Sequence, residues 1–362
     1  MRPVSVRIMH PEPGPQAGPI ARWVADRRAA VAERHRIAFA VAGAADVAVV
    51  SGPQHDLPFG ARLRALVRAE RPAGLVILGS GAIPLATPAD RRALVAVAGG
   101  ERRIALANNR YSADVVAIAH AEVLADLPDL PGDNALPRWL TEVAGYEMAD
   151  LRGRWRLAID IDGPLELVLL GDQASPPGID LEPLRTRIAQ IRAVAANRRA
   201  ELLVTGRTSP ATLAWLEGAT AARVRAIVEE RGLRAASRLA LGPPDGDDAA
   251  EPRPAASLLG MLVERDGPAS LGEHLLKLAD AAIVDSRVLL AHRLGSDEAR
   301  WPPAEDRFAS DLLLPDRIAD PWLRELTSAA VASRIPILLG GHSLVGPGVR
   351  LLLGARMAAR WM

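Results

Sequence analysis

Polar residues that can carry chemistry stand at the ends of short apolar runs along the chain. In the first half these residues are Gly79, Ser80, Gly81, Asn108, Asn109, Asp160 and Asp162. In the second half they are Gly206, Arg207, Thr208, Ser209, Arg231, Asp285, Arg287, Gly340, Gly341 and His342. Open parallel sheets bind ligands at the carboxyl ends of their strands, so each group marks a candidate ligand-binding edge.

The segment Gly206–Ser209 predicts an anion site in the second half. It follows an apolar run and opens a helix, with Ser209 as N-cap and Pro210 at the first helical position. A helix N-terminus, two hydroxyls and the Arg207 guanidinium favour a phosphate or a carboxylate. The alternative is a well-capped helix that binds nothing.

His342 is the candidate acid or base of the second half. It follows Gly340 and Gly341, whose lack of side chains permits close backbone approach. Near neutral pH an imidazole can act as acid, base or ligand, and Asp285 is its candidate partner in a hydrolase or phosphatase. The alternative is a histidine hydrogen-bonded for structural reasons.

Several cations of the second half could converge on one ligand. They are Arg207, Arg231, Arg287, His292 and Arg307. Bidentate guanidinium groups would suit a phosphorylated or acidic ligand. Structural ion pairs would produce the same sequence pattern, so both interpretations stay open.

The first half has three smaller candidates. Gly79–Gly81 could wrap an anion with backbone amides, or form a tight turn. Asn108 and Asn109 could bind a base or a sugar edge, or simply occupy a turn. Asp160 and Asp162 would lie on one face of a strand and could share a cation such as Mg²⁺. In the alternative interpretation, an aspartate caps the helix that begins after them.

Short apolar runs alternate with longer helical segments, which predicts an α/β protein with mainly parallel sheets. The predicted strands are Val4–Met9, Val47–Ser51, Leu75–Gly79, Ile104–Asn108, Trp155–Ile161, Glu201–Thr205, Val224–Glu229, Ala281–Asp285 and Ile335–Leu339. The predicted helices are Ile20–Val41, Ala61–Ala69, Pro88–Ala98, Ala135–Ala144, Leu181–Ala196, Pro210–Glu217, Leu271–Ala279, Glu305–Leu313, Pro321–Ser333 and a last one from Leu344.

The Pro- and Gly-rich segment Gly171–Gly178 predicts a domain boundary. The first domain, residues 1–171, is expected to contain a mostly parallel sheet. The second, residues 179–362, is expected to be a three-layer α/β sandwich with a loose loop near 242–254.

Composition excludes several classes of function. The net charge of +1 argues against a nucleic-acid partner bound by bulk charge, and the absence of cysteine excludes disulfides, iron–sulfur clusters and thiol catalysis. The first residues contain no apolar segment typical of a signal peptide, and no apolar run reaches the length of a membrane span. A cytoplasmic protein with no membrane partner is expected.

Three stretches of the first half resemble a known family. Leu75–Asp90 resembles a strand followed by D-x-P-L-x-T-P, Leu157–Leu167 resembles D-x-D-T-P-E-D-L, and Asn109–Val116 lies where the family has a polar turn and a strand. Over residues 1–170 the chain resembles nucleotidyltransferases with a glycosyltransferase-A-like fold, of the molybdenum-cofactor guanylyltransferase and phospholactate guanylyltransferase type. The resemblance implies a nucleotide pocket at Gly79–Gly81 and Asn109, with Asp160 and Asp162 as metal ligands.

Two departures from the family pattern make its usual mechanism doubtful. The first predicted strand runs into His10–Pro15, whose three prolines lack amide donors for a triphosphate. Ala82 stands where the family has a metal-binding aspartate. We therefore expect a nucleotidyltransferase-like protein, active or degenerate, that binds a nucleotide or a phosphorylated metabolite. The alternative is a non-catalytic structural or ligand-sensing module, for instance at a homodimer interface, with any chemistry in the second domain.

Overall fold

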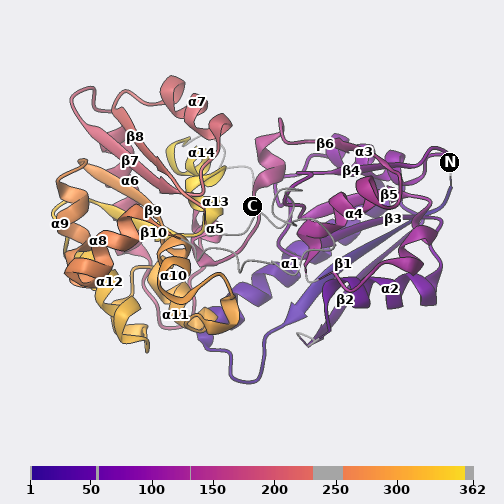
Figure 1. Ribbon diagram of the computed structural model, residues 1–362, viewed down its shortest axis with the longest axis horizontal. Coiled ribbons are helices and arrows are strands. Elements are labelled where there is room, and N and C mark those ends of the chain that lie inside the picture. The colour runs from indigo at the N-terminus through magenta and orange to yellow at the C-terminus, as the bar shows by residue number, and fades with distance from the viewer. Residues whose placement is uncertain (1, 54–56, 131, 231–255, 355–362) are drawn as a thin grey trace, which may run out of the picture. The chain divides into compact units, whose positions relative to one another are not determined.

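The computed structural model describes residues 2–53, 57–130, 132–230 and 256–354 (Figure 1). The backbone divides into two compact units. Among the described residues, the first unit comprises the chain up to Gln16 and Ala25–Ile161, and the second comprises Ala17–Val24 and the chain from Asp162 onward. Arg231 and the loop predicted near 242–254 lie outside the described residues.

The first unit contains a mixed six-stranded sheet with the order β2-β1-β3-β5-β4-β6. Its strands are β1 (Val4–Glu12), β2 (Asp46–Pro53), β3 (Gly74–Gly79), β4 (Ile104–Ala107), β5 (Val115–Ala119) and β6 (Glu147–Asp150). Its α-helices are α1 (Pro19–Val41), α2 (Phe59–Glu70), α3 (Pro88–Ala98) and α4 (Leu136–Glu142), and the first residues of α1 belong to the second unit.

Apolar side chains cover both faces of this sheet. In β3, Val76 and Leu78 point into one core, whereas Leu75 and Ile77 point into the other. This alternation follows from the two-residue period of a strand. Helices α1 and α3 pack against the first core, and α2 and α4 pack against the second.

Strand β5 runs against its neighbours in the first sheet. It pairs antiparallel with both β3 and β4, whereas β1 pairs parallel with β2 and β3, and β4 pairs parallel with β6. The start of β5 therefore lies at the edge where the other strands end. Residues that precede β5, such as Asp114, reach the same edge as residues that follow β3, such as Gly79.

The second unit contains a parallel four-stranded sheet with the order β10-β9-β7-β8. Its strands are β7 (Glu201–Gly206), β8 (Arg223–Val228), β9 (Ala281–Asp285) and β10 (Ile337–Gly340). Its α-helices are α5 (Pro164–Leu169), α6 (Glu182–Ala195), α7 (Pro210–Ala219), α8 (Leu258–Asp266), α9 (Leu271–Leu276), α10 (Ser286–Leu294), α11 (Ala304–Asp311), α12 (Pro321–Ala332), α13 (His342–Val345) and α14 (Gly348–Leu353). Every residue of β9 and β10 is buried, as expected for parallel strands covered on both faces.

The α/β class and most predicted elements are confirmed, with small shifts at their ends. The N-terminus of α3 is capped, because Thr87 and Asp90 form a reciprocal capping box with Pro88 in the first turn. Strands β5 and β6 and helices α8 and α10 were not among the elements predicted from the sequence pattern. Strand β6 is short and not strongly apolar, and α10 begins directly where β9 ends, so neither has a clear sequence boundary.

The predicted strand Trp155–Ile161 is wrong. Trp155–Ala158 form a 3-10 helix, and only Asp160 makes an isolated antiparallel bridge, to Ala82. The apolar residues of this segment are buried without strand pairing, because Leu157 belongs to the core beside α1 and α3. The argument that Asp160 and Asp162 share one face of a strand therefore fails.

The boundary between the two compact units lies after Ile161. The linker predicted at Gly171–Gly178 lies inside the second unit, after α5. Among the described helices, none is both long and apolar enough to cross a membrane.

Candidate functional site

A pocket of about 480 Å³ lies in the first unit, where β1, β2 and β3 end and β5 begins. Its walls are mainly apolar, with a few polar groups. The lining residues are Met9, His10, Pro11, Val50, Ser51, Gly52, Leu57, Phe59, Arg62, Ala65, Leu66, Ile77, Leu78, Gly79, Ala113, Asp114, Val115, Val116, Asp133 and Leu136. Its volume and lining are typical of small-molecule sites.

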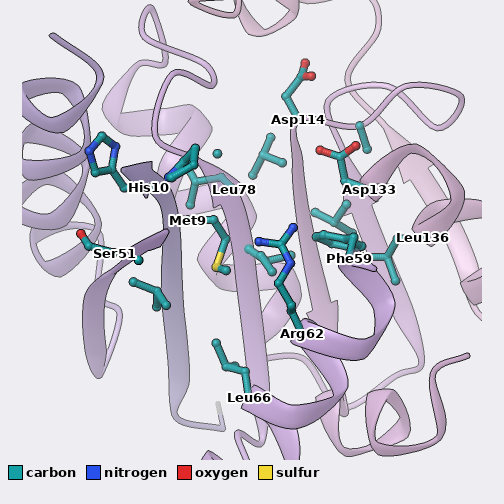
Figure 2. Close-up of a pocket in the computed structure, with 18 of the residues that line it drawn as sticks. Met9, His10, Ser51, Phe59, Arg62, Leu66, Leu78, Asp114, Asp133 and Leu136 are labelled. Atoms are coloured by element: carbon teal, nitrogen blue, oxygen red, sulfur yellow. The ribbon is translucent and has the colours of Figure 1, made fainter. Parts of the chain in front are cut away.

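Arg62 is the cationic side chain of this pocket. Helix α2 places it there because Phe59, Arg62 and Leu66 are spaced by three and four residues and share one helix face. Figure 2 shows the guanidinium pointing into the pocket near Met9. In the described part of the chain, its Nε is buried and has no hydrogen-bond partner. An unsatisfied buried donor is costly, so a ligand acceptor at this position would be stabilised.

His10 lies at the opposite side of the pocket from Asp133, and its ring points away from Arg62, on the face of the sheet opposite Met9 (Figure 2). Burial, aided by the nearby Arg28 charge, lowers the pKa of His10 below its ordinary value. Its Nδ1 lies 3.0 Å from the Ser80 Oγ, within hydrogen-bonding distance. The loop that begins at His10 was considered from the sequence but set aside because of its prolines, and the residue was not among the predicted site residues; in the structure β1 continues to Glu12.

Two carboxylates complete the polar lining. Asp114 accepts a hydrogen bond from the Asn108 side chain at 2.7 Å, and Asp133 lies on the side of Phe59 and Leu136 (Figure 2). Asp114 reaches the pocket because β5 enters the sheet from this edge. With Arg62 and a neutral His10, the lining has one positive and two negative side chains.

The predicted residues of the first half have mostly structural roles. The amides of Gly79 and Ser80 donate to the carbonyls of Asp114 and Met9, so both are already used within the backbone. Asn108 is 3 % exposed and joins the start of β5 to Leu157 through four hydrogen bonds. Asn109 accepts from the Tyr111 amide in a turn. Of the predicted residues, Gly79 alone lines the pocket.

The predicted metal ligands do not make a magnesium site by themselves. Asp160 lies beside Gly81 in the first unit, whereas Asp162 belongs to the second and pairs with His342. Ala82 supplies only a methyl group. Among the described residues, no group of three or more His, Cys, Asp or Glu side chains could hold a metal ion. The alternative interpretation, in which an aspartate caps the following helix, is also wrong, because Gly163 is the N-cap of α5.

The carboxyl edge of the second sheet brings other predicted residues into contact. Arg207 after β7 donates to both carboxylate oxygens of Asp285 at 2.6 and 3.0 Å. Gly206 makes this approach possible, because a Cβ there would lie 2.2 Å from the Asp285 Cβ and its φ is +122°. Arg287 after β9 makes the same bidentate contact with Asp311, at 2.7 and 2.6 Å.

Glu166 is a buried acid next to this edge. It is 4 % exposed and accepts a hydrogen bond from the Gly163 amide. Burial, followed by the Asp162 and Asp311 charges, raises the pKa of Glu166 to about 8. At neutral pH it is therefore protonated, and the nearby Asp311 carboxylate is paired with Arg287.

His342 does not contact Asp285 in any hydrogen bond or ion pair that the structure shows. Its Nδ1 lies 3.3 Å from the Asp162 carboxylate, and both side chains are about two-fifths exposed, at 41 % and 42 %. Gly340 accepts from the Ser286 hydroxyl, and Gly341 has open space where a side chain would stand. This edge therefore has a partly exposed imidazole–carboxylate pair.

The remaining predicted residues serve local structure. Ser209 caps α7 by accepting from the Thr212 amide, as predicted, and the Thr208 Oγ1 is buried without a partner in the described part of the chain. His292 accepts from the Ser257 amide and contacts Glu264. Arg307 pairs with Glu298 and lies over the Trp301 ring.

Four residues that sequence reasoning missed have distinctive environments in the structure. They are His10, Arg62, Asp133 and Glu166. A signal existed for Arg62, since it interrupts an apolar helix stripe, and for Glu166, three residues after the N-cap of a short apolar helix. Asp133 had no such signal, because it lies in a 3-10 turn.

No protein-family model matches the sequence, and no curated protein or solved structure is similar enough to count as a match. The resemblance to nucleotidyltransferases therefore depends on the quoted motifs alone.

Proposed function

We propose that the first unit binds a nucleotide in the pocket that contains Arg62. The observation that carries the proposal is an apolar pocket of about 480 Å³ at a carboxyl strand edge, with a buried guanidinium nitrogen that has no partner in the described residues. Such pockets usually orient a ligand with a few convergent polar groups. Here Arg62 and Asp133 are those groups.

The finer assignments belong to the same proposal. The first unit would have a glycosyltransferase-A-like fold, and the second would be a three-layer α/β sandwich. The nucleotidyl-transfer activity would be lost or reduced, because Ala82 cannot replace a carboxylate ligand. Among the described residues, Asp160 is also not part of a group of three or more side chains that could hold a metal ion. A role of Mg²⁺ stays a prediction. The unfolding experiment described below tests it by comparing ligands with and without the metal ion.

The alternative, a non-catalytic module with any chemistry in the second unit, has its own support. The guanidinium groups of Arg207 and Arg287 are each held by a buried carboxylate, which disfavours capture of an anion there. The partly exposed His342–Asp162 pair at this edge is the candidate group for acid–base chemistry. A hydrolase of this kind would turn over a generic phosphate ester and lose that activity in His342→Ala.

Thermal unfolding of the full chain against a panel of nucleotides and nucleosides, with and without Mg²⁺ or Mn²⁺, tests the main proposal. A ligand present at 100 times its Kd stabilises the native state by about 2.7 kcal/mol, which raises Tm measurably. We expect such a rise with at least one ligand of the panel. No rise with any of them would overturn the proposal.

A further inference from the structure

The charge of the pocket limits which part of a nucleotide can enter it. Among the lining residues, Arg62 is the one cation, whereas Asp114 and Asp133 are carboxylates and His10 is neutral at pH 7. The lining therefore has a formal charge of −1. A nucleoside triphosphate carries several negative charges, and placing them beside two carboxylates in an apolar pocket is strongly unfavourable.

Three backbone positions at this edge offer no amide to a phosphate. Phosphate loops rely on free amides that point at the ligand. Here the Gly79 and Ser80 amides donate to backbone carbonyls, and Pro11 has no amide proton. The loop after β3 is therefore closed to an anion at these positions.

The same lining suits an uncharged heterocycle with a polar edge. Met9, Phe59 and Leu136 offer apolar surface, while the unpartnered Nε of Arg62 offers a donor. The Asp133 carboxylate, on the side of Phe59 and Leu136, adds a polar group to this lining. A guanidinium can also stack on an aromatic ring.

We propose that the pocket holds the nucleoside part of the ligand, with Arg62 contacting the base or the sugar, and leaves every phosphate outside. The inference rests on the proposed nucleotide function and deepens it. It means that a nucleoside binds with about the same affinity as its phosphorylated forms, and that binding needs no divalent cation.

Calorimetric titration of the full chain tests this inference. Each of the four common ribonucleosides is compared with its monophosphate and triphosphate, with and without Mg²⁺. For the nucleoside that binds, we expect a Kd within about threefold of its triphosphate and no effect of Mg²⁺, a difference of less than about 0.7 kcal/mol. A triphosphate that binds more than tenfold tighter would overturn the inference and leave the nucleotide function standing. If no member of the series binds, both proposals are wrong.

Arg62→Gln identifies the pocket as the binding site. We expect the variant to weaken nucleoside binding by about tenfold or more, since a buried hydrogen bond from a charged donor is lost. Arg68→Gln is the matched control, because Arg68 is on the same helix but donates to the Ala125 carbonyl at the surface. Equal nucleoside affinity in both variants would overturn the inference, and unfolding curves of the two verify that each is folded.

Discussion

At the carboxyl edge of the second sheet each central arginine faces a buried carboxylate, whereas in the pocket of the first sheet the Arg62 Nε has no partner among the described residues. Both edges hold arginines among buried groups. Only for the paired arginines does a carboxylate offset the free-energy cost of burying the charge. An unsatisfied donor costs stability and remains available to a ligand. On the proposed function, pairing and not residue type would separate Arg207 and Arg287, which are held by carboxylates, from Arg62.

The largest predicted effect comes from breaking a pair in the second unit. Asp285→Asn removes the charge that Arg207 faces, while the Arg207 side chain stays only 15 % exposed. Since an uncompensated buried charge remains, we expect the free energy of unfolding to fall by about 3–5 kcal/mol, measured by urea denaturation. Asp316→Asn, at an exposed position, is the control. A loss below about 1 kcal/mol would show that the pair is not a structural one.

The next effect is a pH dependence caused by Glu166. Its folded pKa of about 8 exceeds the ordinary value of 4.5, so the folded state binds a proton that the unfolded state releases. Stability therefore falls as pH rises from 4.5 to 8. Between pH 5 and 7.5, wild type should lose about 3 kcal/mol more than Glu166→Gln, which has no proton to release.

Urea unfolding of both proteins at these two pH values measures the difference, in which the other titrating groups cancel. The exposed Glu217→Gln variant should keep the pH dependence of wild type. Parallel pH profiles for wild type and Glu166→Gln would contradict a protonated Glu166.

The smallest effect is expected in the pocket. Arg62→Gln removes a charge whose Nε has no partner in the described residues, so the free energy of unfolding should not fall and should rise by at most about 1 kcal/mol. Arg7→Gln provides the contrast within the same unit, because Arg7 is 5 % exposed and pairs with Glu70 and Asp46. If Arg62→Gln destabilises the protein as much as Arg7→Gln, Arg62 has a structural role and the comparison fails.

The sequence predicted the elements better than the contacts between them. Short apolar runs located β1, β3, β7 and β9, and the Ser209–Pro210 signal located the start of α7. These patterns are local, since they express the burial of one strand on both faces and the capping of one helix. The segment around Trp155 failed because an apolar run can also be buried in a 3-10 turn.

The sequence by itself determined the α/β class, most strands and helices, and the position of Arg207, Asp285 and Arg287 after parallel strands. The tertiary structure decided that Arg207 pairs with Asp285, and that Arg62 enters a pocket without a partner for its Nε among the described residues. Pairing joins residues far apart in the chain and depends on strand order, and here also on the reversed direction of β5. Local patterns do not encode that order, so a structural and a binding arginine are indistinguishable until the chain is folded.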